Sequence, residues 1–283
     1  MQFRGPNASA VSTDDTSPGP KLGTAWSVDL PGRGLSSPII IGDKVFLTAS
    51  SGPEQENLHV LCFSAADGSK LWDRMLRATG RTMSHKKTCV AAPTPCSDGE
   101  LVYALYSSND LFAFDLEGNL RWLRGLTFDY ANASNSLGMA SSPVVVGKTL
   151  VVQSENDSES IALGIDTASG KNRWKMDRPK AANWTSGVVW NDTVALQSKT
   201  GLTGIDPMTG RVVWDYQDGA ATITSSAVGK AGIYIPSNGL TAILPEKEST
   251  SQLWREEGLK PGTPSPLVLG DAIYVVNGAG VLV

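Results

Sequence analysis

A tryptophan that returns at a near-constant interval is the strongest constraint on how this chain can fold. Successive copies are 46, 50, 52, 40 and 40 residues apart, at Trp26, Trp72, Trp122, Trp174, Trp214 and Trp254. A fixed period of roughly 20–50 residues is typical of solenoids, propellers and other repeat architectures. The chain is therefore expected to contain about six copies of one supersecondary unit.

The copies share an element that ends in this tryptophan. Four of them read CFSAADGSKLW, FAFDLEGNLRW, GIDTASGKNRW and GIDPMTGRVVW, and their common glycines are Gly68, Gly118, Gly170 and Gly210. A fifth copy, LPEKESTSQLW, has Thr250 in the glycine position. Glycine permits a tight turn between two strands, and an indole packed across its bare backbone buries about 150–250 Å². We predict that these glycines and all six tryptophans are structural docking residues, not a ligand cage.

A second element opens each copy. Ser/Thr-Pro or a relative of it is followed seven residues later by an apolar residue, as from Pro38 to Val45 and from Pro143 to Leu150. Turn pairs such as Gly42-Asp43 stand between them, which is typical of a hairpin. Each copy thus holds four strands, expected in the third copy at 143–147, 149–154, 161–166 and 172–177. No segment shows the spacing of an amphipathic helix. The expected fold is an all-β propeller of four-stranded antiparallel blades, with about six blades.

The docking elements resemble those of the PQQ-repeat family of β-propellers, which run Ala-x-Asp-x-x-Thr-Gly-Lys-x-x-Trp. The copies with Asp166 and Asp206 match best, and the resemblance extends over residues 22–283. The family includes quinoprotein alcohol dehydrogenases and BamB-like proteins. The opening Gln2-Phe3-Arg4-Gly5-Pro6-Asn7 resembles the start of BamB-like propellers of planctomycete-type bacteria. That likeness implies an exported protein, in the periplasm or outside the cell.

The ends of the chain leave two interpretations of the ring open. Residues 1–21 are expected to form an extended segment, and 22–283 the propeller domain. Trp26–Leu30 has the character of a lone fourth strand, and Asn277–Val283 that of a third strand in a sixth blade. The two could pair and close a six-bladed ring, with Trp26 beside Val281, which would remove exposed edges. The family resemblance favours instead a fragment of an eight-bladed ring.

Composition and charge exclude several classes of function. The net charge is −4 and no run of five Lys/Arg occurs, so no nucleic-acid partner is expected. No apolar run reaches the roughly 18 residues of a membrane span, and residues 1–6 lack the apolar stretch of a signal peptide. Cys62, Cys89 and Cys96 are expected to be buried or free thiols, with a Cys89–Cys96 disulfide as the alternative. The chain is expected to be a monomer.

The resemblance to quinoprotein dehydrogenases fails at their cofactor residues. Those enzymes hold their cofactor with adjacent cysteines, a metal-binding Glu/Asn/Asp set and a tryptophan floor, and no Cys-Cys pair occurs here. Serine-hydrolase, zinc-protease and P-loop signatures are also missing from the sequence. We therefore predict no catalytic residue, no cofactor and no metal ligand. Residues 155–159 are acidic and could hold a weak Ca²⁺ ion, but lack the spacing of a calcium loop.

Uneven loop lengths indicate where a partner could bind. Loops after the second and fourth strands share one face, and the long ones are 50–58, 76–90, 126–139 and 154–160. Long loops in a compact ring usually carry function. The candidate partner-binding loop contains Arg77, Arg81, His85, Lys86 and Lys87. The expected function is a non-catalytic scaffold for a protein or peptide. The alternatives are a PQQ-dependent dehydrogenase-like protein with a divergent site, and a polysaccharide-binding propeller with Trp184 and Trp190 as platforms.

Overall fold

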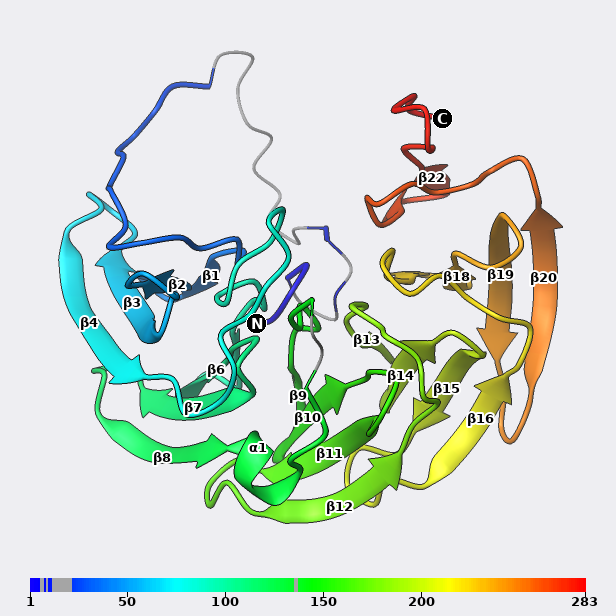
Figure 1. Cartoon of the computed structure of the whole chain (residues 1–283). Helices are drawn as coiled ribbons and strands as arrows, with labels where there is room; N and C mark the ends of the chain where they lie inside the picture. The colour runs from blue at the N-terminus through cyan, green and yellow to red at the C-terminus, as the bar shows by residue number, and fades with distance from the viewer. Residues whose placement is uncertain (6–7, 9, 12–21, 135–136) are drawn as a thin grey trace.

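Six antiparallel sheets follow one another along the chain and stand radially around a common axis (Figure 1). The computed structural model describes residues 1–5, 8, 10–11, 22–134 and 137–283. The first three sheets have four strands each: β1 (Ile39–Ile41), β2 (Lys44–Ser51), β3 (Asn57–Ser64) and β4 (Lys70–Arg77); β5 (Cys96–Ser97), β6 (Leu101–Leu105), β7 (Asp110–Asp115) and β8 (Leu120–Gly125); β9 (Val144–Val146), β10 (Thr149–Ser154), β11 (Ile161–Asp166) and β12 (Asn172–Asp177).

Two further sheets have four strands and the last has two. Their bounds are β13 (Val188–Trp190), β14 (Thr193–Ser198), β15 (Gly201–Ile205) and β16 (Val212–Tyr216); β17 (Ala227–Gly229), β18 (Gly232–Ile235), β19 (Leu240–Pro245) and β20 (Thr250–Glu256); β21 (Leu267–Leu269) and β22 (Ala272–Tyr274). The all-β propeller class expected from the sequence is confirmed, with five complete sheets and a partial one. The strands of the third sheet lie within one residue of their predicted bounds.

Burial explains why the middle strands of the third sheet are rich in branched apolar residues. Every residue of β10 is buried, and five of the six residues of β11 are. The fourth strand, β12, alternates between buried and exposed positions, as expected at the rim of the ring. Apolar clusters fill the space between neighbouring sheets; one of them joins Phe46 and Trp72 of the first sheet to Phe112 and Phe114 of the second. The core is therefore a series of layers between sheets.

The ring is open between the first sheet and the β21–β22 pair, which lie on the two sides of the opening in Figure 1. The N–H of Asn277 donates to the carbonyl of Val281 in the turn that follows β22 (3.0 Å), whereas the indole of Trp26 donates to the carbonyl of Ala65, just after β3 of the first sheet (3.0 Å). The prediction of a six-bladed ring closed by Trp26 beside Val281 is therefore wrong. Trp26–Leu30 is not a strand either, and it pairs with no strand of the part of the chain that the structure describes.

Two features of the loops and the N-terminus differ from the expectation. A one-turn helix, α1 (Leu126–Asp129), follows β8. Residues 1–5 lie inside the ring near its axis (Figure 1), where the nitrogen of Met1 donates to the carbonyl of Ser97 (2.8 Å). The rest of the predicted extended segment falls largely on residues 6–7, 9 and 12–21, which lie outside the described residues. In the described part of the chain, no helix is both long and apolar enough to cross a membrane.

All three cysteines are buried, and none is in a disulfide. The alternative of a Cys89–Cys96 bond is therefore wrong. Cys96 begins the innermost strand of the second sheet, where burial raises the pKa of its thiol. Burial likewise raises the pKa of Cys62 to about 11. The cysteines thus serve as small apolar residues of the core.

Candidate functional site

The loops that follow the second and fourth strands of the first three sheets form one continuous layer, here called the loop face. The side chain of Gln55 accepts a hydrogen bond from the backbone of Val90 (3.0 Å). The N–H of His85 donates to the carbonyl of Leu137 (2.9 Å). Ser158 donates to the carbonyl of Asn132 (2.9 Å), which links the third sheet to the second. The four loops singled out in the sequence therefore support one another.

The five residues of the candidate partner-binding loop, Arg77, Arg81, His85, Lys86 and Lys87, are all exposed on the loop face. Arg77 lies 3.8 Å from the carboxylate of Glu56. Hydrogen bonds from backbone N–H groups, and then the charge of Arg77, lower the pKa of Glu56. The remaining cations of this loop form no ion pair with a described carboxylate. The loop is thus a local basic surface on an acidic protein.

Sequence reasoning missed a further cation of this surface. The exposed Arg33 donates through Nη2 to the carbonyl of Lys86 at 3.1 Å, and its backbone pairs with Ser50 in both directions (2.8 Å). Arg33 precedes Lys86 by 53 residues. Only the fold brings the two together, because the segment before β1 crosses the end of the first sheet.

A cavity of about 360 Å³ opens at the centre of the ring. Its apolar wall includes Phe3, Leu35, Trp184 and Ile223. The indole of Trp184 is half-buried and donates to the carbonyl of Gly138 in the loop face (2.7 Å). The cavity therefore lies beside the loop face, and the Trp184 platform considered in the sequence belongs to its wall.

Hydroxyl groups around this cavity join the sheets to one another. In each of five successive pairs, a backbone N–H donates to the side-chain hydroxyl of the equivalent residue in the next sheet. The pairs are Ser37–Thr94 (2.9 Å), Thr94–Ser142 (3.0 Å), Ser142–Ser186 (2.9 Å), Ser186–Ser225 (3.0 Å) and Ser225–Ser265 (3.1 Å). These residues stand directly before the Pro positions of the repeat. We call them the hydroxyl relay. Their periodicity was visible in the sequence, but their role was missed.

Glu155, in the acidic segment considered for calcium, is fully buried. Its Oε1 accepts from Arg178 at 2.7 Å, and its Oε2 accepts from Asn183 at 3.0 Å. Burial raises the pKa of Glu155, while the charge of Arg178 opposes that shift. Among the described residues, no group of three His, Cys, Asp or Glu side chains could hold a metal. Glu155 therefore anchors the connection that leads to Trp184, and the idea of a calcium ion at this residue is wrong.

Four of the predicted docking tryptophans lie against the turn glycine of the following sheet. The pairs are Trp26–Gly68, Trp72–Gly118, Trp122–Gly170 and Trp174–Gly210. Each of these glycines has a φ between +69° and +82°. Each indole N–H also donates to a carbonyl of the following turn, at 2.8–3.0 Å. The ring of Trp174 lies in addition against Gly164 of its own sheet, a contact that the sequence analysis missed.

The two remaining tryptophans are placed differently. Trp214 is buried against Gly204 of its own sheet. Trp254 is 37% exposed and its ring lies 5.8 Å from that of Tyr234. No described glycine of a following sheet lies against either ring. Trp214 therefore lacks the docking contact because the following copy has Thr250 in place of the turn glycine.

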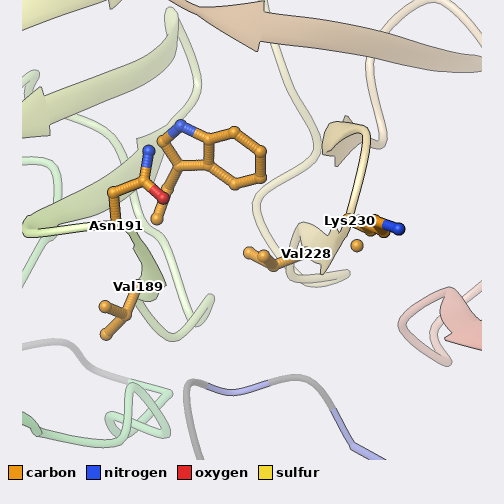
Figure 2. A pocket seen from close by; sticks show the side chains of 6 residues that line it. Val189, Asn191, Val228 and Lys230 are labelled. Carbon is orange, nitrogen blue, oxygen red and sulfur yellow. The ribbon is translucent and has the colours of Figure 1, made fainter.

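A second cavity, of about 290 Å³, lies between the fourth and fifth sheets. Figure 2 shows Val189 and Asn191 on one side of it, and Val228 and Lys230 on the other. The half-buried Trp190 also lines it. These residues belong to the ends of the first strands, β13 and β17, and to the turns that follow them, so the cavity lies on the face opposite the loop face. The two tryptophans proposed as saccharide platforms therefore do not share a site.

The complete sheets are four-stranded and radial, and a tryptophan of one sheet packs on the turn glycine of the following sheet. This combination defines a β-propeller of PQQ-type repeats. The family profile described as outer membrane protein assembly factor BamB matches residues 23–216. The chain belongs to this family. It is 23% identical over 320 residues to the outer membrane protein assembly factor BamB of Bordetella pertussis, covering 91% of this chain and 74% of that protein.

Solved structures show the same architecture. The crystal structure of BamB from Moraxella catarrhalis superposes with a TM-score of 0.66 at 17% identity, over 91% of this chain and 72% of that one. Quinohemoprotein alcohol dehydrogenase from Comamonas testosteroni gives a TM-score of 0.58 at 13% identity, over 79% of this chain and 44% of the enzyme. At these identities the likeness is one of fold, and carries no cofactor or activity to this chain.

Proposed function

We propose that this chain is a non-catalytic scaffold that binds a protein or peptide partner through its loop face. The observation that carries the proposal is the basic loop, whose exposed cations are held in place by the other loops of the same layer. A surface of this kind favours an acidic partner, because complementary charge speeds association and fixes orientation. The residues assigned to it are Arg77, Arg81, His85, Lys86 and Lys87, with Arg33 added by the fold.

The proposed location is the bacterial periplasm or the cell exterior. Membership of a family described as an outer membrane assembly factor supports it. A PQQ-dependent activity is not part of the proposal, because the sequence has no adjacent cysteines. We expect no change in the absorption spectrum of PQQ with Ca²⁺ when the protein is added. A saturable spectral shift would restore the dehydrogenase alternative.

Charge reversal tests the loop face. The variant Lys86→Glu/Lys87→Glu is compared with Lys148→Glu/Lys171→Glu, whose exposed lysines stand in turns after first and third strands and so on the opposite face. Each protein is cross-linked in bacterial envelope extract, and captured proteins are quantified by mass spectrometry. We expect at least one protein to be captured by the wild type and the control, and at least tenfold less by the loop variant. Equal capture by all three would overturn the proposal.

A second candidate function is supported by the cavity in Figure 2. A tryptophan ring beside an amide and an ammonium group suits an acidic sugar, since the ring stacks on the pyranose and Lys230 pairs with its carboxylate. Calorimetric titration with a uronic-acid oligosaccharide tests it. Binding that disappears in Lys230→Glu supports a saccharide site, and a wild type that binds no sugar at millimolar concentration argues against it.

A further inference from the structure

Met1 pairs through its backbone with the innermost strand of the second sheet, near the axis of the ring. The nitrogen of Met1 donates to the carbonyl of Ser97 (2.8 Å), and the N–H of Ser97 donates to the carbonyl of Met1 (2.7 Å). Ser97 belongs to β5, the innermost strand of the second sheet. The innermost strand has a free edge that faces the axis, and a peptide can extend such an edge by main-chain pairing.

Arg4 connects the same segment to the other side of the ring. Its guanidinium donates to the carbonyl of Ser226 (3.2 Å) and to that of Pro266, which stand just before the fifth and sixth sheets. Burial lowers the pKa of Arg4 to about 10. Its described partners are carbonyl oxygens, not carboxylates. The carbonyl oxygens of Ser226 and Pro266 therefore bind the guanidinium of Arg4 inside the ring.

The backbone at Arg4 indicates that these contacts hold the segment in place. Arg4 has a φ of +64°, in the left-handed region that is unfavourable for a residue with a side chain. Such a conformation persists only where surrounding contacts fix it. The turn is closed by the N–H of Gly5 on the carbonyl of Gln2 (2.9 Å), and Gln2 is buried.

Phe3 supplies the aromatic part of the contact. Its side chain lines the central cavity together with Leu35, Trp184 and Ile223. Leu35 and Ile223 are each more than half exposed, so the wall keeps apolar surface that Phe3 does not cover. Main-chain pairing at Met1, an apolar wall at Phe3 and two carbonyl oxygens at Arg4 thus follow one another along this segment.

We infer that the central cavity of this propeller, with the edge of β5 beside it, is a peptide-binding site for a segment with an aromatic residue followed by arginine, and that Met1–Gly5 is its resident ligand in cis. This site is distinct from the loop face, and the inference goes beyond the scaffold function proposed above. We expect a partner segment of the same chemistry to displace the resident segment from this cavity.

A peptide in trans tests the inference on residues 1–283 as one chain. The variant F3A/R4A removes the two side chains that hold the resident segment. Calorimetry then measures binding of the pentapeptide Met-Gln-Phe-Arg-Gly amide to the variant and to the wild type. We expect saturable binding to the variant, at least tenfold tighter than to the wild type. Peptides with alanine in place of Phe or Arg should bind at least tenfold more weakly, because the first loses the apolar contact with the cavity wall and the second loses the two hydrogen bonds from the guanidinium.

A measurement on the unaltered protein guards against a variant that does not fold. The N–H of Ser97 points to the carbonyl of Met1, so its hydrogen exchange reports occupancy of the peptide-binding site. We expect exchange at Ser97 to be at least a hundredfold slower than in the unfolded chain. Exchange at the unfolded rate, or equal binding of the pentapeptide and a scrambled control to F3A/R4A, would overturn the inference.

Discussion

The backbone N–H of Ser142 donates to the hydroxyl of Ser186, 44 residues further along the chain and in the next sheet, at 2.9 Å. Both residues are buried. The same bond recurs from sheet to sheet in the hydroxyl relay, so the first four sheets are positioned against their neighbours both at the inner end and at the outer tryptophan, and the last two at the inner end. These contacts between neighbouring sheets explain how the separate sheets keep one radial arrangement.

Removing one hydroxyl of the relay should destabilise the ring. Ser186→Ala leaves the N–H of Ser142 buried without an acceptor, and we expect the free energy of unfolding to fall by about 1–3 kcal/mol. Ser186→Thr keeps the hydroxyl and should recover part of the loss. Urea denaturation measures the effect, with the exposed Ser249→Ala as a control expected within about 0.5 kcal/mol of the wild type. A Ser186→Ala protein as stable as the control would contradict a structural role for the relay.

Alanine at a docking glycine should cost more stability than alanine at another glycine of positive φ, because only the first also crowds a tryptophan ring. An added Cβ at Gly170 would lie 2.7 Å from the ring of Trp122, whereas nothing lies within 4 Å of one at Gly147. Both glycines have positive φ, so both alanine variants bear a strain of about 1–2 kcal/mol. Gly170→Ala should lose about 1–3 kcal/mol more, from overpacking. Thermal unfolding by calorimetry would show this difference, and equal midpoints would argue against a tight Trp122 contact.

The buried ion pair between Glu155 and Arg178 gives a third prediction. Glu155→Ala leaves the guanidinium buried without its counter-charge and should cost about 3–5 kcal/mol. The double variant Glu155→Leu/Arg178→Met removes both charges and should lose much less. Chemical denaturation of both variants compares these costs. A double variant that is less stable than Glu155→Ala would contradict this prediction, because it would show that the ion pair stabilises the fold more than an apolar pair does.

The three thiols should be unreactive in the native protein. Burial raises the pKa of Cys62, Cys89 and Cys96, so little thiolate forms near neutral pH. A colorimetric thiol reagent should find almost none at pH 8 in the native state, and all three after denaturation without reductant. A count of one after denaturation would instead indicate a disulfide.

The raised pKa of Cys62 predicts that the protein loses stability at alkaline pH. Thiols of the unfolded chain ionise near pH 8.5, while Cys62 in the fold ionises at about 11. The unfolded state therefore releases protons first, and the free energy of unfolding should decline as the pH rises from about 8.5 toward 11. Cys62→Ala should flatten this decline in a pH series of urea denaturation curves. An unchanged slope would show that Cys62 does not contribute to it.

Regular features of the repeat could be predicted, and irregular ones could not. The strands of the third sheet follow from periods of two and from turn glycines, which act over a few residues. The helix after β8 and the position of Arg33 beside Lys86 depend on which loops meet across sheets. The pairing of Glu155 with Arg178 likewise follows from burial, which an acidic segment does not reveal by itself.

The sequence alone determined the repeat, the strands and the tryptophan–glycine elements, because those are set by local turn chemistry and apolar alternation recurring along the chain. Only the tertiary structure decided that the ring is open between its terminal sheets, that a row of hydroxyls joins neighbouring sheets, and that Phe3 and Arg4 lie at the axis. These contacts join residues up to 262 positions apart. No local pattern encodes which of many chemically equivalent carbonyls and apolar surfaces such distant side chains will meet.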